Sequence, residues 1–241
     1  SIKEKNIQKI VLVWSWIMGN VLSCIAYRMN ELSNIDIRVI LASEYLCQKI
    51  DTAENTVHII FSPSWKNQDC CKIASFLENS SSLTIWLTSN VWSTFSQILS
   101  HVLFLRADNV LTALPVGTMM STLVHWLMMS SLIINKKWWD YEKYIMIFDT
   151  LFDVWTNLKN NLIIEKNIKR AMPDLINVKN IIILGHWPNY YLAQYFASFF
   201  ELFTWKYWKG IASWELKYWT LQKVGIETLV LILMPDDNLF D

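Results

Sequence analysis

The chain has 241 residues, enough for one large domain or two small ones. Its 21 Lys and Arg residues balance 21 Asp and Glu residues, so no basic field is available and we expect no nucleic-acid partner. The four cysteines show neither CxxC nor Cys/His spacing, which predicts a reduced, cytoplasmic protein without a metal site.

Short β-branched runs alternate with helix-period segments in the first 160 residues. The predicted strands are Lys9–Val13, Ile37–Leu41, Val57–Ser62, Leu83–Thr88 and His101–Leu105. The predicted helices are Met18–Leu32, Asn67–Leu77, Ser93–Ser100, Val116–Ile134 and Trp139–Asn160. This βαβα order predicts an α/β fold, a doubly wound parallel sheet flanked by helices.

One apolar stretch leaves two interpretations open. Leu111–Asn135 carries no Asp, Glu, Lys or Arg and is long enough to span a bilayer. It also contains Pro115, Gly117 and His125 and many hydroxyl and amide side chains. A helix buried between layers or in a subunit interface would look the same, and we expect this alternative and no membrane partner.

The last third of the chain begins the same pattern again. The charged residues 161–179, which include Pro173, predict a helix and a linker. A strand at Asn180–Leu184, a helix at Asn189–Phe203 and a strand at Glu227–Leu233 follow. We therefore predict a first subdomain over residues 1–160 and the start of a second, truncated one over residues 180–241. No leader sequence is recognisable, and the chain ends suggest a fragment of a longer protein.

The two subdomains share an internal repeat. The strand ending at Trp14 matches the strand ending at Gly185, and each is followed by a helix. Glu44 lies 30 residues after Trp14, and Glu215 lies 30 residues after Gly185. This common spacing predicts two copies of one unit.

Two loops have side chains suited to a phosphate group. In an open parallel sheet, ligands bind beyond the carboxyl ends of the strands. The loops after the first and third predicted strands bring hydroxyl and amide groups to the start of a helix, where an anion is favoured. These residues are Ser15, Ser62, Ser64 and Asn67. Residues of these types also serve as ordinary helix caps, and that alternative stays open.

Three segments resemble the SIS (sugar isomerase) family, in particular the isomerase part of the glucosamine-6-phosphate synthases. Ser62–Asn67 resembles the family's S-Q-S-G-E-T phosphate loop, and Ala42–Tyr45 its A-S-E-F segment. Ser213–Leu221 resembles A-G-E-L-K-H-G-T-I, the most specific of the three. Order and spacing agree from about Lys9 to Pro235. The resemblance implies two SIS subdomains, a homodimer, a sugar-phosphate substrate and no cofactor.

The resemblance also implies roles for individual residues. Ser15, Ser62, Ser64 and Asn67 fall where the family grips the sugar phosphate, and Glu215 falls in a substrate-binding segment. Glu201 falls near the catalytic base, provided that one residue is inserted between it and Glu215; the alternative is an ordinary helix-surface carboxylate. Tyr218 replaces the His that assists ring opening, Ser198 the Lys before the base, and Pro63 a Gln of the phosphate loop.

Two functions follow from this resemblance. The first is the isomerase part of an enzyme that makes glucosamine 6-phosphate from fructose 6-phosphate and glutamine-derived ammonia. A glutaminase domain is then expected in the full-length chain. The alternative is a non-catalytic SIS module that binds a phosphosugar and regulates a partner, which the departures at Ser198 and Tyr218 favour.

Tryptophan stands where glycine is expected. The chain has 14 Trp and only 5 Gly, although about 17 Gly would be average at this length. The Trp residues at family glycine positions or in turns are Trp14, Trp65, Trp92, Trp187, Trp214 and Trp219. We hypothesise that a genome reading the codon UGA as glycine was translated with a table reading it as tryptophan. Trp155, in an amphipathic helix, is interpreted as genuine; the alternative is a truly Trp-rich pseudoenzyme or an engineered chain.

Overall fold

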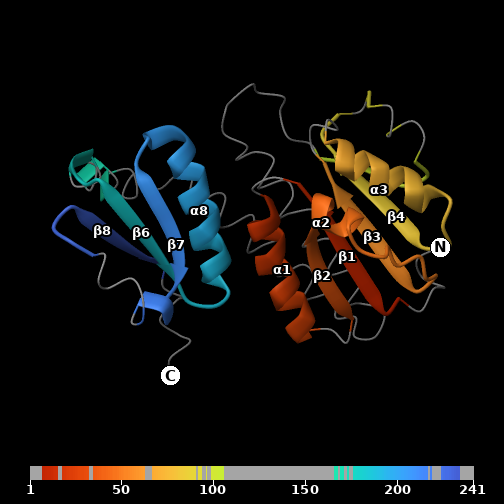
Figure 1. Ribbon diagram of the computed structural model, residues 1–241, viewed down its shortest axis with the longest axis horizontal. Coiled ribbons are helices and arrows are strands. Elements are labelled where there is room, and N and C mark those ends of the chain that lie inside the picture. The colour runs from red at the N-terminus through yellow and green to blue at the C-terminus, as the bar shows by residue number, and fades with distance from the viewer. Residues whose placement is uncertain are drawn as a thin grey trace. The chain divides into compact units, whose positions relative to one another are not determined.

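The computed structural model describes residues 7–15, 18–32, 35–62, 67–90, 92–93, 96, 99–105, 166–167, 169–170, 173, 176–216, 218 and 224–233. Internal contacts divide the chain into two compact units, Ser1–Ser130 and Ser131–Asp241. Each unit holds a parallel sheet with helices packed on it (Figure 1). The subdomain boundary predicted at residues 161–179 stays a prediction.

The first unit contains a five-stranded parallel sheet in the order β2-β1-β3-β4-β5. Its strands are β1 (Lys9–Trp14), β2 (Asp36–Leu41), β3 (Thr56–Phe61), β4 (Leu83–Thr88) and β5 (Val102–Phe104). Its described helices are α1 (Met18–Leu32), α2 (Ala42–Leu46) and α3 (Gln68–Glu78). From β1 the chain adds β2 on one side and β3 on the other, so the gap between β1 and β3 is the topological switch point.

The core of this unit forms because the central strands are apolar on both faces. All six residues of β3 are buried, and so are the four middle residues of β1. Such continuous apolar runs are typical of parallel strands covered by helices on both sides. The helix α3 contributes Cys70, Ile73, Ala74 and Leu77 to the same core.

The second unit contains a three-stranded parallel sheet with the order β7-β6-β8. Its elements are β6 (Asn180–Gly185), α8 (Asn189–Thr204), β7 (Tyr207–Ala212) and β8 (Thr228–Leu233). Its strand order reproduces that of β2-β1-β3. Trp14 lies opposite Leu41 in the first sheet, and Gly185 lies opposite Ala212 in the second. Gly185 follows Trp14 by 171 positions, and Ala212 follows Leu41 by the same 171 positions. The predicted internal repeat is therefore confirmed by the register of the strands.

Most predicted elements are confirmed, together with the α/β fold class. Strand β4 and helix α1 match their predicted bounds residue for residue. Strand β7 and the short helix α2 were not predicted. The predicted helices Val116–Ile134 and Trp139–Asn160 and the apolar stretch Leu111–Asn135 lie outside the described residues. Within the described part of the chain, no helix is long and apolar enough to cross a membrane.

Candidate functional site

The two sheet edges that could hold a ligand lie at the carboxyl ends of the strands, and the first unit has the more polar one. Ser15 follows β1 and Ser62 follows β3. Trp14 and Phe61, the residues before them, are register partners in the parallel ladder. The two serines therefore emerge side by side at the switch point, where ligands bind in sheets of this kind.

Ser62 carries a buried hydroxyl that has no hydrogen-bond partner in the described part of the chain. Its residue is only 1% exposed, and its backbone N–H donates to the Leu87 carbonyl at 3.1 Å. Among the described residues, no group bonds to the Ser62 Oγ. A buried hydroxyl left unpaired costs about 1–3 kcal/mol, so its retention needs an explanation. A ligand with acceptor oxygens at this edge supplies one.

The start of α3 adds the polarity that an anion needs. Asn67 is the N-cap, and its side-chain oxygen accepts a hydrogen bond from the Cys70 N–H at 2.8 Å. The other N–H groups of the first turn and the helix dipole give this end a partial positive charge. Asn67 thus caps α3, which begins at Gln68, six residues after Ser62.

The Cys70 thiol forms the apolar floor beneath this edge. It is fully buried, and its sulfur lies 4.0 Å from the Phe61 carbonyl oxygen. Burial raises the pKa of the Cys70 thiol to about 12, and a hydrogen bond from Ser15 offsets this only in part. Cys70 therefore stays protonated at neutral pH and acts as packing that links Ser15 to β3. Sequence reasoning missed it, although its place in the first turn of the predicted helix was a usable signal.

The other predicted phosphate-binding residue, Ser64, lies outside the described residues, as do Pro63 and Lys66. Trp14 is described and is half-buried at the end of β1. Its indole lies directly over Gly19, so closely that a Cβ at Gly19 would overlap the ring. The ring therefore covers the first turn of α1, next to Ser15.

The second unit holds the predicted catalytic residues Glu201 and Tyr218, and it separates Glu201 from Glu215, the predicted substrate-binding residue. Glu215 follows β7 at the carboxyl edge and is partly exposed. Glu201 is exposed on α8, twelve residues beyond the first residue of that helix, which is about 18 Å along its axis. Because α8 starts at the carboxyl edge and runs away from it, the unit does not bring Glu201 and Glu215 together. Tyr218 is described, and its side chain is 66% exposed.

A His–Ser pair links the two strand ends of the second unit. His186 Nδ1 lies 3.1 Å from Ser213 Oγ, and the Ser213 N–H donates to the Gly185 carbonyl at 3.0 Å. Beside this pair, burial and the charge of Glu215 raise the pKa of the Tyr190 hydroxyl. The sequence placed His186 after the repeated strand, but its partner Ser213 was recognised only as part of a motif.

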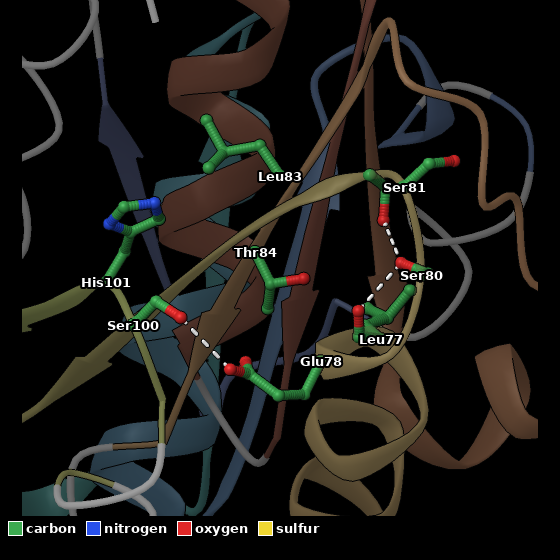
Figure 2. A pocket seen from close by; sticks show the side chains of 9 residues that line it. Leu77, Glu78, Ser80, Ser81, Leu83, Thr84, Ser100 and His101 are labelled. Carbon is green, nitrogen blue, oxygen red and sulfur yellow. Dashed lines mark hydrogen bonds between the residues drawn. The ribbon is translucent and has the colours of Figure 1, made fainter. Parts of the chain in front are cut away.

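Two hollows mark the surface of the first unit. The hollow in Figure 2 lies between the end of α3 and the start of β4, at the amino edge of the sheet. There Ser100 donates a hydrogen bond to the Glu78 carboxylate at 3.0 Å. It therefore lies at the opposite edge from Ser15 and Ser62. A shallower hollow, lined by Ser43, Glu44, Cys47 and Gln48, follows β2 at the carboxyl edge.

Solved structures share the fold of this chain. Two parallel α/β units of this topology form the SIS fold of phosphosugar isomerases, as in tagatose-6-phosphate ketose/aldose isomerase from Escherichia coli. That structure has a TM-score of 0.65 and 13% identity and covers 96% of this chain and 63% of its own. The C-terminal domain of glucosamine-fructose-6-phosphate aminotransferase from Francisella tularensis has a TM-score of 0.88 at 16% identity. It covers 99% of this chain and 70% of its own.

Curated sequences extend this likeness to one particular enzyme, glutamine–fructose-6-phosphate aminotransferase (isomerizing). The Saccharomyces cerevisiae enzyme is 22% identical over 221 residues, which are 90% of this chain and 31% of the relative. The Buchnera aphidicola enzyme is 26% identical over 218 residues, which are 89% of this chain and 35% of the relative. The chain therefore spans about a third of the length of the curated relatives it matches. No family model matches the chain.

The predicted resemblance is thus confirmed, both to SIS domains and to the isomerase part of this enzyme. Glucosamine-6-phosphate synthase and glutamine–fructose-6-phosphate aminotransferase are two names for the same enzyme. The roles assigned to individual residues stay predictions.

Proposed function

We propose that this chain is the isomerase part of an enzyme that makes glucosamine 6-phosphate from fructose 6-phosphate and glutamine-derived ammonia. It works in the cytoplasm as a homodimer, and the longer chain supplies a glutaminase domain. The single observation that carries the proposal is the buried Ser62 hydroxyl at the switch point, for which the residues that the structure describes offer no hydrogen-bond partner. The names of the relatives, all aminotransferases acting on fructose 6-phosphate, support the choice of substrate.

The chemistry of the first edge fits a phosphate group. Phosphate oxygens accept hydrogen bonds from the hydroxyls of Ser15, Ser62 and Ser64. The N–H groups at the start of α3 add further donors, and the helix dipole favours the negative charge. The described part of this site offers donors from Ser15, Ser62 and the start of α3, although Asp69 in the first turn of α3 adds one carboxylate nearby.

The isomerisation step needs only proton transfer. A carboxylate removes the proton from one carbon of the sugar imine and returns it to the neighbouring carbon. We assign this role to Glu201 and ring opening to Tyr218, with Glu215 holding the substrate. Glu201 is exposed, as a base that meets a bound ligand must be before the ligand arrives.

Ser62→Ala tests the binding site. We expect about a tenfold loss of affinity for fructose 6-phosphate, measured by titration calorimetry, because one hydrogen bond to a charged group is lost. Thr84→Ala is the matched control. Thr84 also has a buried hydroxyl without a hydrogen-bond partner among the described residues, but it lies at the opposite edge. Equal affinity in Ser62→Ala and the unchanged protein would remove Ser62 from the site.

The position of Glu201 favours a second candidate, a SIS module that binds a phosphosugar without changing it. Within its unit, Glu201 lies about 18 Å along α8 from the edge that carries Glu215. Exchange of the fructose 6-phosphate C1 proton with deuterated water, followed by NMR, separates the two functions. The isomerase exchanges this proton, and Glu201→Gln abolishes the exchange while Glu78→Gln, at the other edge of the first sheet, leaves it intact. Binding without exchange would favour the module.

A further inference from the structure

The end of α8 holds a tryptophan in a glycine conformation. Trp205 caps the helix with φ 54° and ψ 16°, in the left-handed region. It is the one non-glycine residue with positive φ in the described part of the chain, and its side chain is 97% exposed. Helices commonly end in this conformation, and glycine is the usual residue because it has no Cβ to clash. The exposed indole gains no burial that would offset the strain.

The ends of β1 and β6 show the same requirement by comparison. Gly185 ends β6, and a Cβ there would overlap the backbone of Asn189 and Tyr190 at the start of α8. Its counterpart at the end of β1 is Trp14, whose ring is pressed against Gly19. The same strand end therefore carries glycine in one copy of the repeat and the largest side chain in the other.

Two further tryptophans lie in turns and are poorly buried. Trp92 is 84% exposed, and its backbone N–H donates to the Asn90 side-chain oxygen at 2.9 Å in a tight turn. Trp214 is 49% exposed in the turn after β7. Trp208 behaves differently: it is 7% exposed, and its ring stacks on Phe200 with centroids 4.7 Å apart.

We infer that positions 14, 92, 205 and 214 are glycine in the protein as its source makes it, encoded by UGA read as glycine. One cause then accounts for the shortage of glycine, the surplus of tryptophan and the conformation of Trp205. Position 205 is included because of its backbone geometry alone, since neither the repeat nor the resemblance points to it. The inference does not rest on the proposed function.

The natural protein and its gene provide the direct test. Trypsin cleaves after Lys179, Lys206, Lys209 and Lys217 and releases the peptides Asn180–Lys206 and Gly210–Lys217. In protein purified from the source, mass spectrometry should find glycine at position 205 in the first peptide and at position 214 in the second. The gene should carry UGA at all four positions. Tryptophan masses, or UGG codons, overturn the inference whatever the recombinant chains do.

A recombinant chain tests the physical reason separately. Trp205→Gly should raise the melting temperature by about 2–4 °C, the shift typical of one relieved backbone strain in a chain of this size. Trp205→Ala removes the same indole but keeps a Cβ, so it should not reproduce the rise. Trp208→Gly, which removes a buried ring, should lower the melting temperature. An equal rise for the alanine and glycine variants at position 205 would show that backbone conformation is not the cause.

Discussion

The two units share one topology and differ at the edge where a ligand would bind. In the first unit, this edge has serine hydroxyls, the Asn67 cap and a floor formed by Cys70. In the second unit, it has the His186–Ser213 pair and a cluster of aromatic rings made by Trp187, Tyr190, Tyr191 and Trp214. The repeated strands supply the scaffold, and the loops that follow them decide the chemistry.

The same comparison can be made inside the sheets. His58 in β3 lies opposite Val11, and Val230 in β8 lies opposite Ile182, the repeat counterpart of Val11. The first unit therefore buries a titratable side chain where the second has a partly buried apolar one. Differences of this kind can be measured, because the matched position in the other unit shows which residue the fold accepts.

The largest effect is expected at the strand end of the second unit. Gly185→Ala should lower the free energy of unfolding by roughly 3 kcal/mol, because the new Cβ would overlap the backbone at Asn189. Urea denaturation measures the loss. Gly225→Ala is the control, since a Cβ there meets nothing within 4 Å. A loss at Gly185 no larger than at Gly225 would mean that the strand end tolerates a side chain, and the contrast with Trp14 would lose its meaning.

The buried histidine should make the stability of the first unit depend on pH. His58 is fully buried and bonded through Nε2 to the Tyr45 hydroxyl at 2.7 Å. Burial lowers the pKa of His58 from 6.5 to about 4. The unfolded chain therefore takes up a proton below pH 6.5 that the folded chain refuses until about pH 4. The contribution of His58 to the free energy of unfolding should be fully present above pH 6.5. The free energy of unfolding should then fall by up to about 3 kcal/mol as the pH drops to 4.

Denaturation at several pH values checks this dependence. His58→Val, which installs the residue type found at position 230, should flatten the slope between pH 6.5 and 4. His101→Gln, which changes an exposed histidine just before β5, should leave the slope unchanged. An unchanged slope in His58→Val would assign the acid sensitivity to other groups.

The Trp14 ring, which lies at the carboxyl ends of the strands in the first unit, should affect the affinity for a ligand. Trp14→Gly installs the residue found at the same strand end of the second unit and removes the ring that covers the first turn of α1. We expect affinity for fructose 6-phosphate to rise about tenfold, corresponding to about 1.4 kcal/mol, in titration calorimetry. Trp205→Gly, at the far end of α8, should leave it unchanged. A fall in affinity would mean that the indole contacts the sugar and belongs to the site.

These comparisons also show what the sequence could predict. The strands of a parallel sheet are continuous apolar runs, and β4 was therefore found residue for residue. The helical period of its apolar residues identified α1 just as closely. Strand β7 was missed because Lys209 and Gly210 interrupt its apolar pattern. Gly210 is there because α8 packs so closely that a Cβ would overlap the backbone of Ala193. That need arises between elements and leaves no local signal.

Some features of the candidate site could also be predicted from the sequence, and others could not. The meeting of Ser15, Ser62 and Asn67 at one edge was predictable, because parallel strands end on the same side of a sheet. The separation of Glu201 from Glu215 depends on where a helix points after a strand. The environment of the Ser62 hydroxyl, which has no partner among the described residues, and the left-handed conformation of Trp205 depend on the folded structure, and no residue pattern displays them.

The smallest expected effect concerns the amino ends of the repeated strands. In the second unit, Lys179 and Glu227 form an exposed ion pair at 2.7 Å. At the matching place in the first unit, the Asn55 amide donates to the Gln8 side-chain oxygen at 2.8 Å. Both pairs sit beside backbone bonds that join the same two strands, Lys179 N–H to the Glu227 carbonyl at 3.0 Å and Gln8 N–H to the Asn55 carbonyl at 3.0 Å.

Double-mutant cycles to alanine should give a coupling of about 0.3 kcal/mol for each pair, because exposed pairs gain little over their hydration. Salt separates them. Raising the salt concentration to 1 M shortens the Debye length to about 3 Å and should remove most of the Lys179–Glu227 coupling. The neutral Gln8–Asn55 coupling should persist. Equal salt sensitivity of both couplings would mean that the effect lies in the shared backbone bonds, and that the side chains at these strand starts are interchangeable between the two units.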